Sequence, residues 1–336
     1  MTTRFFRAFL APAAMLSIAA CAELDVTNPN NPDIDRALAS PADVAKIAKS
    51  SVNSWFLAST NWQPYMMLQV TADAGTANFG NFGMRFNNLE PRIAYGNNSA
   101  GGDAQSTVRP WDDNFGALGA ANDALRAIAS GIVVPGADGN AKARAAGLLA
   151  QAGSLTNLAL LFDRAFVVTE ATDLATSPTL VPYTAVRDSA LKKWDDLIAL
   201  TTGKTWSLDG DVIPLSVPAT AANISRIANT MAARTLMLSA RTGTENAATN
   251  WARVLSYADK GITGAVVSDI NFGIIGDGNN IWYNGIVLYG NLDSWTRVDQ
   301  RVINRMAPNV PAKYAGTNVA PVTTDLRLGT ANLPCT

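Results

Sequence analysis

The chain contains no histidine and only two cysteines, and the first absence excludes several classes of enzyme. Histidine is the side chain that most often serves as general base, as nucleophile activator and as metal ligand. A Ser-His-Asp triad, a Cys-His pair and a histidine-bearing zinc site therefore cannot be built from this chain. Catalysis by paired carboxylates needs no histidine, so that one hydrolytic mechanism stays open.

A strong charge of either sign is also missing. The 336 residues carry 26 Lys and Arg against 27 Asp and Glu, for a formal net charge of −1. Nucleic-acid binding normally requires a patch or stripe of clustered Lys and Arg, and no such cluster occurs along the chain. We therefore expect no nucleic-acid partner. Hydrophobic residues make up 48% of the chain, which is enough for a sizeable core.

The first twenty residues have the pattern of a secretory signal peptide. Arg4 and Arg7 precede an apolar run from Ala8 to Ile18. That run of about 11 residues fits the hydrophobic region of a signal peptide, roughly 7 to 15 residues long. It is too short for a transmembrane helix, which needs about 20 apolar residues. Residues 1–20 are thus predicted to be removed from the mature protein.

Cys21 directly follows this signal, in the sequence Ile18-Ala19-Ala20-Cys21. An aliphatic residue and two small residues before cysteine resemble a bacterial lipobox, whose cysteine is lipidated and becomes the first mature residue. The alternative is ordinary cleavage near Ala20, with Cys21 incidental. A lipidated Cys21 leaves Cys335 without a partner, so we expect no intrachain disulfide and assign Cys335 no role.

Residues 21–39 are rich in Asn, Pro and Asp and show no helical or strand period, which predicts an extended tether. The first helix is expected to start at Ser40, because a serine N-cap, a proline at the first helical position and an acid at the third form a start signal. Val44, Ile47, Ser51 and Trp55 then fall on one face.

Five further helices are predicted from apolar residues at helical spacing, over about 110–130, 141–168, from 182 onward, 221–241 and 245–262. The clearest stripe belongs to the helix over 141–168, whose apolar residues are Leu148, Ala152, Leu155, Ala159, Phe162 and Phe166. Three tryptophans lie on such stripes and are predicted to be core residues: Trp111, Trp194 and Trp251.

Paired helices of this kind predict an all-α fold, a tetratricopeptide-like right-handed helical repeat scaffold of about three helix pairs. The strict repeat consensus is absent, so the repeat is degenerate, and an irregular helical bundle is the alternative. The helical domain is expected over 40–263. It carries an inserted loop over 58–109 and is followed by a loop-rich region over 264–336, both rich in Gly, Asn and aromatic residues. Loops of that length are commonly functional.

Several segments together resemble the SusD/RagB family of outer-membrane lipoproteins. The residues that carry the resemblance are the lipobox, Leu24 to Asn30, Gly80 to Arg85, Glu90-Pro91-Arg92, Trp111, Ala120 to Leu125, Ala143-Arg144, Leu161-Phe162-Asp163 and Asp325 to Gly329. Members of that family usually continue further, with another helical pair. The chain is accordingly expected to be short at its C-terminal end, as a fragment or without part of the usual surface.

The resemblance implies a lipid-anchored protein of the outer membrane, facing the cell exterior and without enzymatic activity. Such proteins bind a glycan or another oligomeric nutrient, with no cofactor, and deliver it to a partner TonB-dependent transporter. A tetratricopeptide-like lipoprotein that binds protein partners, without a small-molecule site, is the alternative. A carboxylate-based hydrolase is disfavoured, because Asp112-Asp113 and Asp195-Asp196 have the pattern of solvated helix charges.

A sugar presents an apolar C–H face bordered by hydroxyl groups, so its site combines an aromatic platform with short polar side chains. Such residues gather in the loop 58–109 and in the segment 279–297. The candidate ligand-binding residues are Trp62, Asp73, Arg85, Trp282, Tyr283 and Trp295. The alternative is that these aromatics pack the loops against the helices, and that Asp73 and Arg85 form a structural ion pair.

Overall fold

A computed structural model describes residues 34–77, 84–87, 105–173, 175–264, 282, 284–286, 296–313 and 315–325. The chain divides into two compact units, Met1–Ala37 and Leu38–Thr336. The predicted signal peptide lies outside the described residues, and so do Cys21, Tyr283, Trp295 and Cys335. The domain boundaries predicted from the sequence stay predictions.

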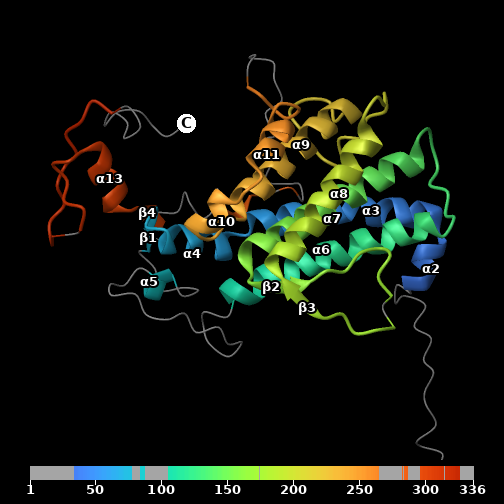
Figure 1. Cartoon of the computed structure of the whole chain (residues 1–336), viewed down its shortest axis with the longest axis horizontal. Helices are drawn as coiled ribbons and strands as arrows, with labels where there is room; N and C mark the ends of the chain where they lie inside the picture. Colours follow the sequence, from blue (N-terminus) through green and yellow to red (C-terminus); the bar gives the residue numbers. More distant parts are fainter. Residues whose placement is uncertain are drawn as a thin grey trace, which may run out of the picture. The chain divides into compact units, whose positions relative to one another are not determined.

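The second unit is built on helices that pack on one another in the order of the sequence. They are α3 (Pro41–Thr60), α6 (Gln105–Ala129), α7 (Gly139–Leu161), α8 (Tyr183–Thr201), α9 (Ala221–Leu238) and α11 (Trp251–Ala258). Each helix has its most extensive contacts with the preceding or following one, and α3 also contacts α7. Figure 1 shows α3, α6, α7 and α8 side by side. The all-α fold class is confirmed, with α3/α6, α7/α8 and α9/α11 as the three pairs.

The start of α3 follows the prediction. Ser40 has extended backbone angles and its Oγ accepts a hydrogen bond from the Asp43 amide at 3.4 Å, while Pro41 is the first helical residue. This arrangement satisfies one of the amides that a helix start leaves without a partner. On the predicted face, Val44 and Trp55 are buried in the main core. Among the described residues, no helix is long and apolar enough to span a membrane.

Helix α7 is buried along most of its length and contacts α3, α6, α8 and α9. It ends at Leu161, so the prediction of one helix to residue 168 is wrong. The chain becomes extended at Phe162 (φ −121°, ψ 147°), and β2 (Arg164–Phe166) then pairs antiparallel with β3 (Leu180–Pro182). The pairing of β2 with β3 therefore ends the helix before the apolar spacing in the sequence does.

The tryptophans predicted to be in the core fall into three different environments. Trp194 is fully buried and its Nε1 donates to Thr156 Oγ1 at 3.0 Å, as predicted for a core residue. Trp111 is half-buried in an aromatic cluster, 4.8 Å from Phe115 and 5.0 Å from Phe162 between ring centroids. Trp251 is 42% exposed, so its assignment to the core is wrong.

The exposure of Trp251 has a local cause. The helix predicted over 245–262 is two helices, α10 (Gly243–Ala247) and α11. The Asn250 side chain accepts a hydrogen bond from the Arg253 amide at 3.0 Å and thereby starts a new helix. Trp251 is therefore the first residue of a new helix, and its Nε1 donates to the Asn246 carbonyl at 3.2 Å.

The predicted loop over 58–109 contains regular structure of its own. It holds the end of α3, then α4 (Trp62–Thr71), β1 (Gly75–Ala77) and α5 (Met84–Asn87). β1 pairs antiparallel with β4 (Thr296–Val298), which is followed by α13 (Gln300–Met306). The two regions that the sequence marks as loop-rich are therefore joined by strand pairing. A short helix, α2 (Ile34–Ala39), lies in the predicted tether.

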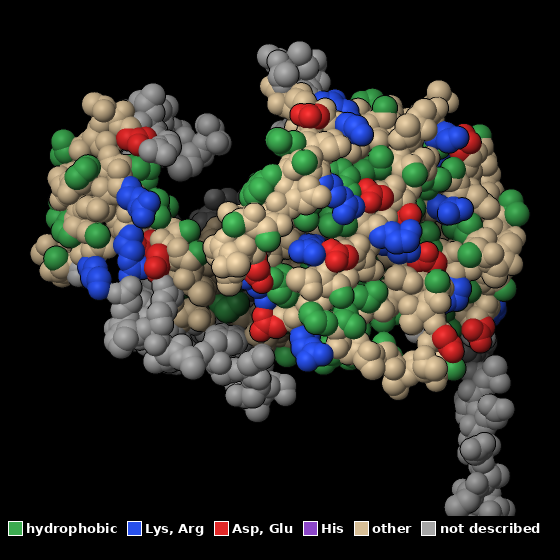
Figure 2. Space-filling model, in the orientation of Figure 1, with side chains coloured by type: hydrophobic (Ala, Val, Ile, Leu, Met, Phe, Trp, Pro, Cys, Tyr) green, Lys and Arg blue, Asp and Glu red, His purple; other side chains and the backbone are tan. Residues whose placement is uncertain are grey.

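On the face drawn in Figure 2, Lys and Arg side chains lie interspersed with Asp and Glu side chains over the stacked helices. Surface ion pairs among the described residues include Lys192 with Asp196 at 3.0 Å and Arg253 with Asp195 at 3.0 Å. Each such exposed pair contributes little to stability, about 0 to 1 kcal/mol.

Candidate ligand-binding site

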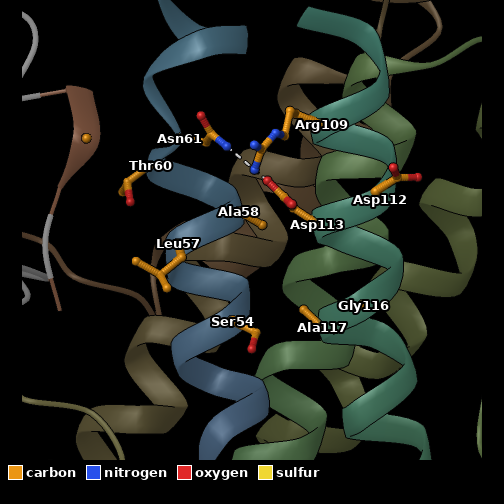
Figure 3. A pocket seen from close by; sticks show the side chains of 11 residues that line it. Ser54, Leu57, Ala58, Thr60, Asn61, Arg109, Asp112, Asp113, Gly116 and Ala117 are labelled. Atoms are coloured by element: carbon orange, nitrogen blue, oxygen red, sulfur yellow. Dashed lines mark hydrogen bonds between the residues drawn. The ribbon is translucent and has the colours of Figure 1, made fainter. Parts of the chain in front are cut away.

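An open cleft of about 610 Å³ lies between α3 and α6 (Figure 3). Its volume falls within the range of roughly 300 to 1,000 Å³ that is typical of small-molecule sites. The residues that line it are Ser54, Leu57, Ala58, Thr60, Asn61, Arg109, Asp112, Asp113, Gly116, Ala117 and Gly285. Among them are hydroxyl, amide, guanidinium and carboxylate groups beside a small apolar surface, which is a set suited to a polyhydroxylated ligand.

Helical spacing creates the two walls. On α3, Ser54, Ala58 and Asn61 follow one another at intervals of four and three residues, and α6 presents Arg109, Asp113 and Gly116 at the same intervals. Residues three and four apart lie on one face of a helix, so each wall is a single continuous face. Gly116 keeps the cleft open, because no atom lies within 4 Å of the position that a Cβ would occupy there.

One hydrogen bond crosses the cleft at the end of α3. The Asn61 Nδ2 donates to Asp113 Oδ2 at 2.9 Å. Asn61 is the C-cap residue directly after α3, and it has extended backbone angles (φ −62°, ψ 123°). The Arg109 side chain is directed toward this Asn61–Asp113 contact (Figure 3). A cation, an amide and a carboxylate thus lie close together at one end of the cleft.

Both walls are also held together by a neighbouring helix. From α7, the Asn157 Nδ2 donates to Ser59 Oγ on α3 and to Asn114 Oδ1 on α6, each at 2.9 Å. Asn114 is fully buried, and its own Nδ2 donates to the Pro110 carbonyl at 2.7 Å. These bonds fix the spacing of α3 and α6, so the cleft is preformed.

Among the described residues that line the cleft, the charged side chains all lie on one wall. From Ser50 to Ala72, a stretch that covers the end of α3 and all of α4, the sequence has no Asp, Glu, Lys or Arg. Arg109, Asp112 and Asp113 on α6 therefore supply all the charge among the lining residues. The sequence alone suggested that the two acids are solvated helix charges, and the structure places both at the cleft.

The structure places the backbone of Trp62 and Arg85 and the side chains of Asp73 and Trp282. Trp62 is the first residue of α4, directly after Asn61, and Arg85 lies in α5. Asp73 has a left-handed backbone (φ 56°) and forms an ion pair with Arg301 of α13. Asp73 thus has a structural partner in Arg301.

Trp282 is packed inside the molecule. It is 5% exposed, and its ring centroid lies 5.3 Å from that of Phe56 on α3. This placement agrees with the alternative in which a loop aromatic packs its loop against the helices. Gly285, three residues further on, lines the cleft. The two sequence regions favoured for ligand binding therefore do meet at this cleft, through Asn61 and Arg109 on one side and Gly285 on the other.

A second hollow of about 310 Å³ lies among α8, α9, α10 and the start of α11, but its charged groups are paired. Glu245 accepts from the Tyr183 hydroxyl at 2.7 Å, and this hydrogen bond lowers the pKa of the carboxyl group. The Arg253 guanidinium contacts Asp195 at 3.0 Å and the Tyr257 hydroxyl at 2.8 Å. Burial, with the Asp195 carboxylate, raises the pKa of Tyr257 to about 12. The α3–α6 cleft is the better candidate site.

In the part of the chain that the structure describes, no group of three or more Cys, Asp or Glu side chains is placed to hold a metal ion. Sequence reasoning missed Asn61, Arg109 and Asp113 as site residues. The available signal was the spacing of Arg109, Asp113 and Gly116 on one helix face, opposite an uncharged stretch.

Comparisons with known proteins leave the family open. No protein-family model and no curated protein matches the chain. A solved structure of a SusD superfamily protein from Bacteroides thetaiotaomicron VPI-5482 is similar with a TM-score of 0.44 and 13% sequence identity, over 64% of this chain. The chain spans 45% of the length of that structure. At this similarity, the comparison does not assign the chain to a family.

Proposed function

We propose that this protein is an outer-membrane lipoprotein that binds a glycan or another oligomeric nutrient and delivers it to a partner TonB-dependent transporter. It binds without cleaving. Cys21 is the lipidated residue that holds it on the exterior face. The observation that carries the binding function is the preformed polar cleft between α3 and α6.

The chemistry of the cleft supports a polyhydroxylated ligand. Carboxylates such as Asp113 accept hydrogen bonds from hydroxyl groups, and amides such as Asn61 both donate and accept. Leu57 and Ala58 offer an apolar surface for the C–H face of a sugar ring. A ligand that exposes alternating hydroxyl and C–H groups can use both kinds of surface at once.

The test is calorimetry on the full lipoprotein in detergent with a panel of oligosaccharides. Gly116→Phe places a ring in the open space of the cleft. We expect at least one glycan to bind the parent protein. Gly116→Phe should weaken that binding at least about tenfold, because the ring occupies the space of the ligand. A tenfold change corresponds to about 1.4 kcal/mol of binding free energy.

Gly210→Phe is the matched control. Gly210 also has no atom within 4 Å of a Cβ position, and it lies in the connection between α8 and α9, outside the cleft. Circular dichroism checks that both variants fold. The proposal fails if no glycan binds, or if a bound glycan is equally insensitive to both substitutions.

A second candidate function, binding of protein partners, is favoured by apolar side chains exposed near the end of the stack. Leu238 on α9 and Trp251 and Leu255 on α11 are 46%, 42% and 62% exposed. Exposed aromatic and aliphatic side chains of this size are common at protein interfaces. Under this function a transporter would co-purify with the lipoprotein while no member of the glycan panel binds.

A further inference from the structure

We infer that the α3–α6 cleft selects its ligand by charge, and that it takes neutral and amine-bearing glycans in preference to glycans that carry carboxylates. This inference deepens the proposed function and rests on it. The selection follows from the placement of three charged side chains on one wall: Arg109, Asp112 and Asp113.

Among the described lining residues the net charge is negative. Two carboxylates and one guanidinium give a formal sum of −1, and the described residues of the α3 wall add no charge. The single cation, Arg109, is directed toward the Asn61–Asp113 contact (Figure 3). Asp112 and Asp113 place two carboxylates on the same wall as this guanidinium.

The carboxylates keep acceptor capacity for a ligand. Asp113 uses Oδ2 to accept from Asn61, and among the described residues no hydrogen bond is made to its Oδ1. Asp112 is exposed and makes no hydrogen bond to any described residue. Oxygens of this kind bind hydroxyl or ammonium groups well, since charge-assisted hydrogen bonds are shorter and stronger than neutral ones. A ligand carboxylate would instead meet charge of its own sign.

The expected size of the effect is moderate. Asp112 is exposed, so water and salt weaken its field, and the Debye length is about 10 Å at 0.1 M salt. Like charges a few ångströms apart still repel in such a cleft. We therefore expect a preference of roughly three- to tenfold at low salt, and a smaller one at high salt.

The second hollow should show no such preference. Its charged lining residues are Arg187, Asp188, Glu245 and Arg253, whose formal charges cancel. Binding there would be unaffected by substitution in the α3–α6 cleft. Charge selection that depends on Asp112 therefore identifies the cleft in which the glycan binds.

The test uses trios of oligosaccharides that share length and linkage and differ in whether each sugar carries hydroxyl groups alone, an amine at C2 or a carboxylate at C6. One trio is β-1,4-linked glucose, glucosamine and glucuronate, and a second is α-1,4-linked galactose, galactosamine and galacturonate. Binding is measured by calorimetry on the full lipoprotein at pH 5.5. We expect the neutral and amine-bearing members to bind at least about threefold more tightly than the acidic member.

Asp112→Asn tests the cause of the preference. Removing this charge should reduce the ratio of affinities between the neutral and acidic members about threefold. In the parent protein, 0.5 M salt should also reduce this ratio. Asp209→Asn is the control, because Asp209 lies in the connection between α8 and α9, outside the cleft. It removes the same charge elsewhere and should leave the gap unchanged.

The two levels of the proposal fail in different ways. If no member of any trio binds, the proposed glycan-binding function fails together with the inference. A trio may bind with an affinity that Gly116→Phe weakens, while its acidic member binds as tightly as the neutral member or more tightly. In that case only the charge selection is overturned. A gap that Asp112→Asn leaves unchanged overturns it as well.

Discussion

Two helical glycines, Gly116 and Gly153, have opposite surroundings, and the difference decides what each contributes. Gly116 faces the open cleft, with no atom near its Cβ position. Gly153 on α7 lies against the ring of Trp55 on α3, where a Cβ would approach ring atoms to 2.2 Å. The first glycine leaves space for a ligand, and the second allows two helices to pack closely.

These surroundings predict stability changes of opposite sign for the same substitution. Gly116→Ala should raise the free energy of unfolding by about 0.5 to 1 kcal/mol, because alanine loses less backbone entropy in a helix. Gly153→Ala should lower it by about 1 to 3 kcal/mol, because the core has no room for the added methyl group. Urea denaturation of both variants measures the two changes. Equal effects at the two sites would contradict the packing described for Trp55.

At the scale of elements, one polar network joins three consecutive helices. Glu170, in the connection after β2, accepts from Lys193 Nζ on α8 at 2.7 and 2.8 Å and from Gln151 Nε2 on α7 at 2.7 Å. Gln151 Nε2 also donates to Asn122 Oδ1 on α6 at 2.6 Å. Lys193 and Gln151 are buried, so this network is costly to break.

The network predicts a loss of stability in acid. Burial of Glu170 acts to raise its pKa, but the hydrogen bonds from Lys193 and Gln151 outweigh it, and the pKa lies below its ordinary value. A carboxyl group with a lowered pKa in the folded state stabilises the protein above its unfolded pKa, about 4.3 for glutamate. That contribution disappears as the pH falls through the lower, folded pKa.

The measurement is the urea midpoint at pH 7 and at pH 3, for the parent protein and for Glu170→Gln. The parent should lose more stability on acidification than the variant, whose residue 170 does not titrate. Glu245→Gln is not a suitable control, because the Glu245 pKa is also lowered. Asp209→Asn is the control, because Asp209 lies outside this network. Its urea midpoint should fall between pH 7 and pH 3 by as much as that of the parent protein. A parent and a Glu170→Gln variant with the same pH dependence would exclude this role.

At the scale of the whole molecule, the helical body and its predicted membrane anchor are separate parts of the chain. The body begins with α3 at Pro41, and the predicted anchor at Cys21 lies about 20 residues earlier, beyond the described residues.

Lipidation at Cys21 can be tested in a bacterial host. Cys21→Ser should abolish incorporation of labelled fatty acid and release the protein from the membrane fraction. Cys335→Ser should leave both unchanged, because Cys335 is the second of the two cysteines and lies at the other end of the chain. Labelling that persists in Cys21→Ser would rule out the lipobox.

Local signals in the sequence predicted the helices well and their interruptions poorly. The cap at Ser40 and the apolar spacing around Trp194 act within a few residues, and both predictions are confirmed. The end of α7 at Leu161 depends on β2 pairing with β3, and the exposure of Trp251 depends on the new start at Asn250. A helical period alone does not reveal that a more distant strand or a cap interrupts it.

By itself the sequence determined the all-α class, the order of the helices and the predicted export signal, because caps, apolar periods and signal peptides are local patterns. Tertiary structure alone decided the site. Asn61 and Asp113 are 52 residues apart, and Asn157, which holds the walls from α7, is 98 residues from Ser59. Such contacts form only when α3, α6 and α7 pack together. The cleft and its one-sided charge therefore belong to the folded molecule.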